Sequence, residues 1–226
     1  MRKLLLFDID GTLLRAYGAG GRAMRRAAER VLGERCRGAQ IAFAGALDPW
    51  IFAQIARHGG YELSEPSHEA LRREYAQVLV EELACAEPPC SALPGVHELL
   101  LRLRGEQVAT LGLLTGNYAE TAALKLRAAG IDPQWFEITA FGDLAAERHA
   151  LVPVALAQLA HALPPNHVII VGDTVRDVHC ARKNGCRCIA VATGGSSASE
   201  LAEAGADVVL EDLRDQNAFF QALDAP

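Results

Sequence analysis

Short runs of apolar residues recur along this chain, separated by segments whose apolar residues repeat with the period of a helix. Most of these runs are nearly continuous, which is typical of strands buried on both faces of a parallel sheet. The predicted strands are Lys3–Phe7, Val108–Leu114, Glu137–Ala140, Val168–Val171, Cys188–Val191 and Val208–Leu210. Their alternation with helices predicts an α/β fold with a Rossmann-like, doubly wound parallel sheet.

The ends of several predicted helices carry recognisable signals. Three helix starts show the spacing of a capping box: Asn117 with Glu120, Thr174 with Asp177, and Ser197 with Glu200. Glycines that would end these helices follow at Gly130, Gly185 and Gly205. A further amphipathic helix is predicted over Leu151–Leu163, leading into the strand at Val168.

The stretch after the first strand breaks this alternation. Residues 15–92 show helical patterns near Arg22–Leu32, Asp48–Arg57 and Ser67–Leu83, but no convincing strand. One crossover helix would suffice to connect parallel strands, so this segment is too long for that role alone. We therefore predict a Rossmann-like catalytic core formed by residues 1–14 and 93–226, and an inserted all-helical cap formed by residues 15–92.

The charge balance excludes some classes of protein. The 226-residue chain has 22 Lys and Arg against 28 Asp and Glu, a formal net charge of −6. An acidic chain of this kind is not expected to bind nucleic acid or an anionic membrane surface. Its six cysteines are scattered rather than spaced as a disulfide framework. These features predict a cytoplasmic protein, either a monomer or a homodimer.

Acidic residues follow two of the predicted strands. Asp8 and Asp10 follow the first, and Asp173 follows the strand at Val168–Val171. Buried carboxylates are costly without compensation, and a hard cation such as Mg²⁺ accepts oxygen ligands. Asp8 and Asp10 alone could belong to an ordinary turn at Gly11, and Asp177 could simply cap its helix. Because parallel strands end at one edge of a sheet, the three strand-end aspartates together favour a metal site.

A polar loop follows the strand that ends at Leu114. Thr115 supplies a hydroxyl, Gly116 a flexible amide, and Asn117 the start of a helix. This combination is typical of a phosphate cradle. Asn117 is also expected to be the N-cap of that helix, and the two roles are compatible.

The acidic edge still requires a positive group. Lys125 and Lys183 follow Asn117 and Asp173 along their helices. At a rise of about 1.5 Å per residue, both are expected roughly 12–15 Å from the strand edge. Arg148 precedes the predicted helix at Leu151 and is the better-placed candidate, although a solvent-exposed arginine is the simpler interpretation of its position alone.

Taken together, these motifs resemble the haloacid dehalogenase superfamily, in its phosphatase branch. Its first motif, Asp-x-Asp-Gly-Thr, is matched by Asp8, Asp10, Gly11 and Thr12. The Thr or Ser of the second is matched by Thr115, and the Gly-Asp-x-x-x-Asp of the fourth by residues 172–177. The helical insertion is similar to the cap of the phosphoglycolate phosphatase and β-phosphoglucomutase group, including the Gly-x-x-Asp at residues 45–48.

The third motif departs from the family. It normally contains a lysine followed by proline, whereas this chain has Arg148 followed by His149. Arg148 stands 25 residues before Asp173, the offset that the family pattern gives its lysine. The resemblance therefore implies that Arg148 takes the place of the lysine, since arginine keeps the charge and can form two parallel hydrogen bonds.

The resemblance implies a Mg²⁺-dependent phosphatase that acts on a small phosphorylated metabolite. Asp8 would be the nucleophile and Asp10 the general acid and base, with crowded acidic surroundings keeping Asp10 partly protonated. Asp8, Asp173 and the Asp10 carbonyl would hold Mg²⁺, and Asp177 would orient either the water ligands of the metal or Arg148. The phosphate would contact a set of loop residues and one arginine: Gly11, Thr12, Thr115, Gly116, Asn117 and Arg148.

Two alternatives remain open from the sequence. One is a phosphomutase of the same family. The other is a catalytically weak phosphate-binding or signalling relative, which the arginine in the third motif suggests. The residues do not identify the substrate, and the cap residues Arg22, Asp48 and Trp50 have no assigned role.

Overall fold

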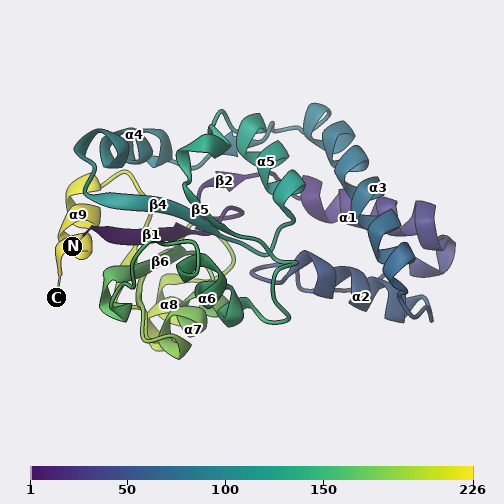
Figure 1. Cartoon of the computed structure of the whole chain (residues 1–226). Coiled ribbons are helices and arrows are strands. Elements are labelled where there is room, and N and C mark those ends of the chain that lie inside the picture. The colour runs from purple at the N-terminus through teal and green to yellow at the C-terminus, as the bar shows by residue number, and fades with distance from the viewer. Residues whose placement is uncertain (1, 226) are drawn as a thin grey trace.

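The computed structural model describes residues 2–225 and contains a parallel sheet of six strands (Figure 1). The strands are β1 (Lys3–Phe7), β4 (Ala109–Leu114), β5 (Ile138–Ala140), β6 (Val168–Gly172), β7 (Arg187–Val191) and β8 (Val208–Leu210). Their order in the sheet is β5-β4-β1-β6-β7-β8, and all neighbours are parallel. The predicted doubly wound sheet is confirmed, with each predicted strand end within one residue of the observed one.

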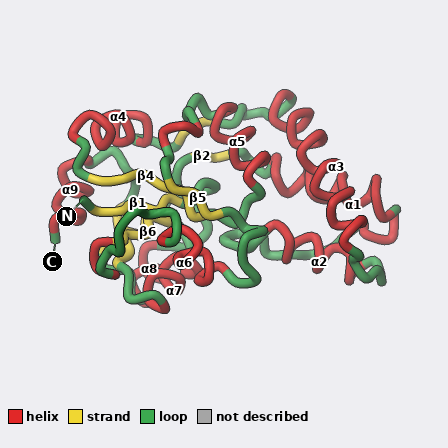
Figure 2. Tube along the Cα trace, viewed as in Figure 1, coloured by secondary structure: helices red, strands yellow, loops and turns green. Residues whose placement is uncertain are grey.

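Helices cover both faces of the sheet (Figure 2). On one face lie α4 (Val96–Glu106), α5 (Ala119–Ala128) and α9 (Gln216–Asp224). On the other lie α6 (Leu151–Leu156), α7 (Val175–Lys183) and α8 (Ala198–Glu203). Leu5 and Phe7 of β1 pack with the first set, and Leu4 and Leu6 with the second. Because alternate residues of a strand face opposite sides, burial on both sides explains the continuous apolar runs.

Some helix predictions are wrong in detail. The helix predicted over Leu151–Leu163 ends at Leu156, after which Gln158 pairs through its amide with both main-chain groups of Thr139 on β5. The capping boxes at Thr174 and Ser197 are confirmed. The one predicted at Asn117 is absent, because α5 begins after Tyr118 and Asn117 directs its side chain elsewhere. Single turns of 3₁₀ helix also occur: η1 (Glu34–Cys36), η2 (Pro133–Trp135), η3 (Arg148–Ala150) and η4 (Pro165–His167).

The inserted segment consists mainly of α1 (Ala19–Leu32), α2 (Asp48–His58) and α3 (Glu65–Ala84), which lie beyond the carboxyl edge of the sheet (Figure 1). Ion pairs between arginines of α1 and glutamates of α3 join these two helices. The expectation that this segment holds no strand is wrong at both of its ends. There β2 (Leu14–Arg15) and β3 (Ser91–Ala92) pair antiparallel, but strands of two residues are too short to show a sequence period.

None of the described helices combines the length and apolar character needed to cross a bilayer.

Candidate active site

The carboxyl ends of the central strands and the cap enclose a cavity of about 400 Å³. Most of the predicted site residues line it: Asp8, Asp10, Gly11, Thr115, Gly116, Asn117, Arg148 and Asp173. From the cap, Met24, Phe43, Ile51 and Tyr75 line the same cavity. Thr12 and Asp177 are not among its lining residues and lie behind it. The topology therefore gathers four separate sequence motifs around one space, as parallel strand ends allow.

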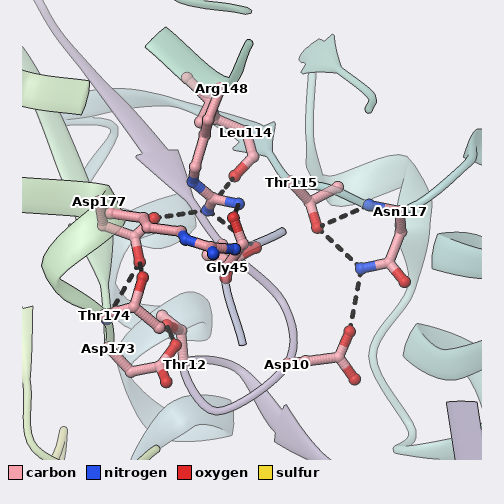
Figure 3. A network of polar contacts seen from close by, with 12 residues as sticks. Asp10, Thr12, Gly45, Leu114, Thr115, Asn117, Arg148, Asp173, Thr174 and Asp177 are labelled. Carbon is pink, nitrogen blue, oxygen red and sulfur yellow. Dashed lines mark hydrogen bonds and ion pairs between the residues drawn. The ribbon is translucent and has the colours of Figure 1, made fainter. Parts of the chain in front are cut away.

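A cluster of three buried carboxylates lies at this edge. Carboxylate oxygens of Asp8, Asp173 and Asp177 all lie within 4.8 Å of one another. Figure 3 shows two of these side chains, Asp173 and Asp177. Burial raises the pKa of Asp8, which Arg148 partly offsets, and burial together with the charge of Asp8 raises the pKa of Asp173. The protein thus leaves part of this negative charge uncompensated. An oxygen-ligated divalent cation fits these residues, because it would supply the missing positive charge.

Asp173 is held by three contacts that its loop and its neighbours provide. The Thr12 hydroxyl donates to Oδ1 at 3.0 Å, and the Gly195 main-chain N–H donates to Oδ2 at 2.7 Å. Gly194 approaches so closely that a Cβ there would lie 1.8 Å from Oδ2. Thr12, expected to contact phosphate, is instead almost fully buried against Asp173. Its small hydroxyl side chain therefore orients a candidate metal ligand.

Arg148 connects the carboxylates to the cap. Its Nη2 lies 3.2 Å from Asp8 Oδ1 and 2.5 Å from Asp177 Oδ1. Its Nη1 donates to the Gly45 carbonyl of the cap loop at 3.4 Å. The side chain is only 7% exposed, and the two carboxylates raise its pKa despite burial. Arg148 is thus a buried counter-charge beside Asp8 and not a solvent-exposed arginine.

Asp177 contacts both the start of α7 and Arg148. Its Oδ2 accepts hydrogen bonds from the Thr174 main chain at 3.1 Å and hydroxyl at 2.6 Å, which completes the capping box of α7. Its Oδ1 accepts from Arg148. Both carboxylate oxygens are therefore engaged by the protein. Of the two groups that Asp177 was expected to orient, it contacts Arg148 directly, and its role in catalysis stays a prediction.

The loop after β4 is tied together by Asn117 (Figure 3). Its Nδ2 donates to Thr115 Oγ1 at 2.8 Å and to Asp10 Oδ2 at 2.9 Å. Its Oδ1 accepts from Lys125 at 2.6 Å. Since an amide carries two N–H donors, both are used within the protein. Asn117 therefore presents no free side-chain N–H to a phosphate, and its expected part in the phosphate cradle stays a prediction.

Lys125 reaches the site, contrary to the distance expected from helical rise. Its Nζ lies 2.6 Å from Asp10 Oδ2, and its side chain is 5% exposed. The predicted distance took the helix to begin at Asn117, but α5 begins at Ala119, so less of the chain before Lys125 is helical. Helical side chains also lean toward the helix N-terminus, and a lysine side chain is long. Asp10 is thus in direct contact with a cation, which the sequence did not predict.

The cap is joined to the core next to the Thr115 loop. The Asp48 main-chain N–H donates to the Gly116 carbonyl at 2.7 Å, and Asp48 Oδ2 accepts from the Tyr118 N–H at 3.1 Å. A Cβ on Gly116 would lie 1.9 Å from the Ala46 carbonyl oxygen, so the contact requires glycine. Burial raises the pKa of Asp48 to about 7. These contacts assign Asp48 a structural position that the sequence left open.

Two features of the site were not predicted from the sequence. Lys125 shares the buried face of α5 with Ala122 and Leu126, so a lone lysine in an apolar stripe was the available signal. Gly194 and Gly195 follow β7, another strand that ends at this edge. A glycine pair after a buried strand was the signal there.

Asp173→Asn is expected to raise the unfolding temperature of the metal-free protein at neutral pH, by the equivalent of about 1–2 kcal/mol. The amide removes a buried charge, and its N–H₂ can donate to Thr12 while its oxygen accepts from Gly195. Because the raised pKa makes the folded protein bind more protons than the unfolded chain, wild-type stability should rise as pH falls from neutral toward the usual aspartate range. The variant should show a flatter pH profile.

Thermal denaturation with and without Mg²⁺ tests whether Asp173 is a metal ligand. Mg²⁺ is expected to stabilise the wild type and Glu203→Gln, an exposed control, but not Asp173→Asn. Equal stabilisation of Asp173→Asn and the wild type would show that Asp173 does not bind the ion.

The fold and the site define an α/β enzyme with a carboxylate centre at the sheet edge, beneath a helical cap. The chain belongs to the haloacid dehalogenase-like hydrolase family, whose model matches residues 5–191.

Three relatives illustrate the similarity. A phosphoglycolate phosphatase of Synechococcus elongatus is 28% identical over 165 residues, 73% of each chain. An N-acetylmuramic acid 6-phosphate phosphatase of Pseudomonas aeruginosa is 27% identical over 218 residues, 94% of this chain and 92% of the relative. The crystal structure of CbbY from Rhodobacter sphaeroides in complex with phosphate superposes with a TM-score of 0.72 at 22% identity, covering 95% of this chain and 96% of that one.

Proposed function

We propose that this protein is a Mg²⁺-dependent phosphatase that hydrolyses a small phosphate monoester through a phosphorylated Asp8. The observation that carries the proposal is the buried contact of Asp8 with Arg148, both of which line the cavity between the sheet edge and the inserted helices. A carboxylate beside a fixed guanidinium is suited to attack an anionic phosphate, because the cation offsets the repulsion between them. The phosphatase activity of the relatives named above supports the same conclusion.

In the first step, an Asp8 carboxylate oxygen attacks phosphorus, and the bond from phosphorus to the ester oxygen breaks. Asp10 gives its proton to the leaving oxygen, so that an alcohol departs. In the second step, water attacks phosphorus, Asp10 takes a proton from it, and the bond to Asp8 breaks. Inorganic phosphate is released and both aspartates are restored. Dividing the displacement in this way replaces one difficult step with two easier ones.

Other residues stabilise the transferring group. Arg148 and the Thr115 hydroxyl would donate to its oxygens, and Gly11 and Gly116 line the cavity without side chains that would exclude it. Asp8 and Asp173, with the Asp10 main-chain carbonyl, would hold Mg²⁺. When bound, the ion offsets negative charge on the transferring group. Arg15, Arg25 and Lys125 also line the cavity, which suits an anionic substrate.

The proposal is tested by release of inorganic phosphate from a panel of phosphorylated compounds, with Mg²⁺ and with a chelator. The panel includes p-nitrophenyl phosphate, phosphoglycolate and N-acetylmuramic acid 6-phosphate. We expect Mg²⁺-dependent turnover of at least one compound, well above that of the Asp8→Asn variant. Release that never exceeds the variant's would contradict the proposal.

A further inference from the structure

Lys125 and Asn117 hold one oxygen of Asp10 from two directions. Lys125 Nζ lies 2.6 Å and Asn117 Nδ2 lies 2.9 Å from Asp10 Oδ2, and the Lys125 amine also donates to Asn117 Oδ1 at 2.6 Å. The three side chains thus form a closed triangle of hydrogen bonds. The other oxygen, Oδ1, receives no hydrogen bond from residues 2–225.

The side chains of Lys125 and Asp10 differ in how far they are buried. Lys125 is 5% exposed at its side chain, whereas the Asp10 side chain is 43% exposed and borders the cavity. A half-exposed aspartate on a loop has several rotamers available. Two buried donors on the same oxygen restrict it to one, since charge-assisted hydrogen bonds are the strongest of their kind.

The cap covers the lysine. A Cβ on Gly20 of α1 would lie 3.2 Å from Lys125 Nζ and 3.5 Å from the Tyr75 hydroxyl of α3. Both glycine and tyrosine belong to the inserted segment, whereas Lys125 and Asn117 belong to the core. The triangle of hydrogen bonds therefore lies where the cap meets the core, and the cap keeps water from the amine.

We propose that Lys125 is a positioning residue for the reaction, an inference that rests on the proposed phosphatase function. By holding Oδ2, it turns Oδ1 toward the ester oxygen of the substrate. Because Oδ2 accepts from an ammonium and an amide, the proton that Asp10 transfers is carried on Oδ1. Lys125 itself forms no bond to the transferring group and moves no proton.

The test compares Lys125→Met with the wild type on two aryl phosphates of similar size. The p-nitrophenolate ion leaves without a proton, whereas phenolate is a poorer leaving group and benefits from one. The value of kcat/KM includes phosphoryl transfer to Asp8 but not the later hydrolysis. We expect kcat/KM for phenyl phosphate to fall about 10–100-fold, a part of the roughly 10²–10⁴-fold that general acid catalysis contributes, because the acid is displaced and not removed. We expect kcat/KM for p-nitrophenyl phosphate to change far less.

Three further variants sharpen the result. Lys125→Arg should restore part of the loss, because the charge is kept. Lys125→Met should add no selective loss in an Asp10→Asn background, since the acid it positions is gone. Lys183→Met, on an exposed lysine whose side chain is 60% exposed, should leave the ratio of the two kcat/KM values unchanged.

The ratio does not depend on the fraction of folded enzyme, so partial unfolding of Lys125→Met cannot imitate the effect. An equal loss on both substrates, or a selective loss that persists in the Asp10→Asn background, would overturn the role of Lys125 while leaving the phosphatase proposal intact. A wild type that releases phosphate from neither aryl phosphate nor any other compound of the panel would overturn both.

Discussion

Asp8→Asn is expected to lower kcat by about 10⁴-fold or more and to leave the fold intact. An amide has nearly the shape of the carboxylate but does not attack phosphorus. Burial raises the pKa of Asp8, so the charge on the wild-type carboxylate opposes folding at neutral pH. Removing that charge is therefore not expected to lower the free energy of unfolding. Phosphate release and thermal unfolding of the two proteins, measured together, check both parts.

The covalent route has a separate signature. Wild-type enzyme quenched with acid during turnover should carry a phosphoryl group on the peptide that contains Asp8, detected by mass spectrometry. Asp8→Asn should carry none, and the exposed control Glu203→Gln should behave as the wild type. A phosphoryl group on another residue, or substantial turnover by purified Asp8→Asn, would exclude Asp8 as the nucleophile.

Arg148→Ala is expected to lower kcat/KM by about 30–1000-fold, which corresponds to about 2–4 kcal/mol of transition-state stabilisation. The guanidinium is the counter-charge next to Asp8 and Asp177, and its removal leaves two buried carboxylates facing each other. The free energy of unfolding should also fall, by about 3–5 kcal/mol, as for other broken buried pairs. Denaturant unfolding, with activity expressed per folded enzyme, separates the two effects.

Arg148→Lys distinguishes charge from shape. A lysine keeps the charge, but it lacks the planar fork that here reaches two carboxylates and the Gly45 carbonyl. We therefore expect activity between those of the wild type and Arg148→Ala. If both variants retained wild-type kcat/KM, Arg148 would have no part in catalysis, and a metal-binding relative with little phosphatase activity would become the better interpretation.

The order of the strands in the chain, and the residues at their ends, could be predicted because each depends on a few neighbouring residues. A strand buried on both faces must be apolar throughout, as in Leu4–Phe7, and a helix start needs its cap within a few residues, as in Thr174 and Asp177. Parallel strands end at one edge, so Asp8 and Asp173 were expected to meet there. The structure brings them together with Asp177.

Arg148 required more than local patterns. The residues around it gave no reason to prefer it over a solvent-exposed arginine, and the family resemblance supplied the reason. Its burial against Asp8 depends on where η3 lies relative to the ends of β1 and β6. That placement is a property of the packed sheet and not of residues 147–150.

By itself, the sequence determined the α/β class, the helical insertion and the acidic strand ends, since these follow from periodicity, caps and strand direction within single elements. Only the tertiary structure decided that Asn117 binds Asp10 instead of capping α5, that Thr12 supports Asp173, and that Lys125 reaches the site. Each of these depends on side-chain reach between elements far apart in the chain. The physical reason is that a buried polar group takes whichever partner the packed fold brings within hydrogen-bond distance, and no local pattern specifies that partner.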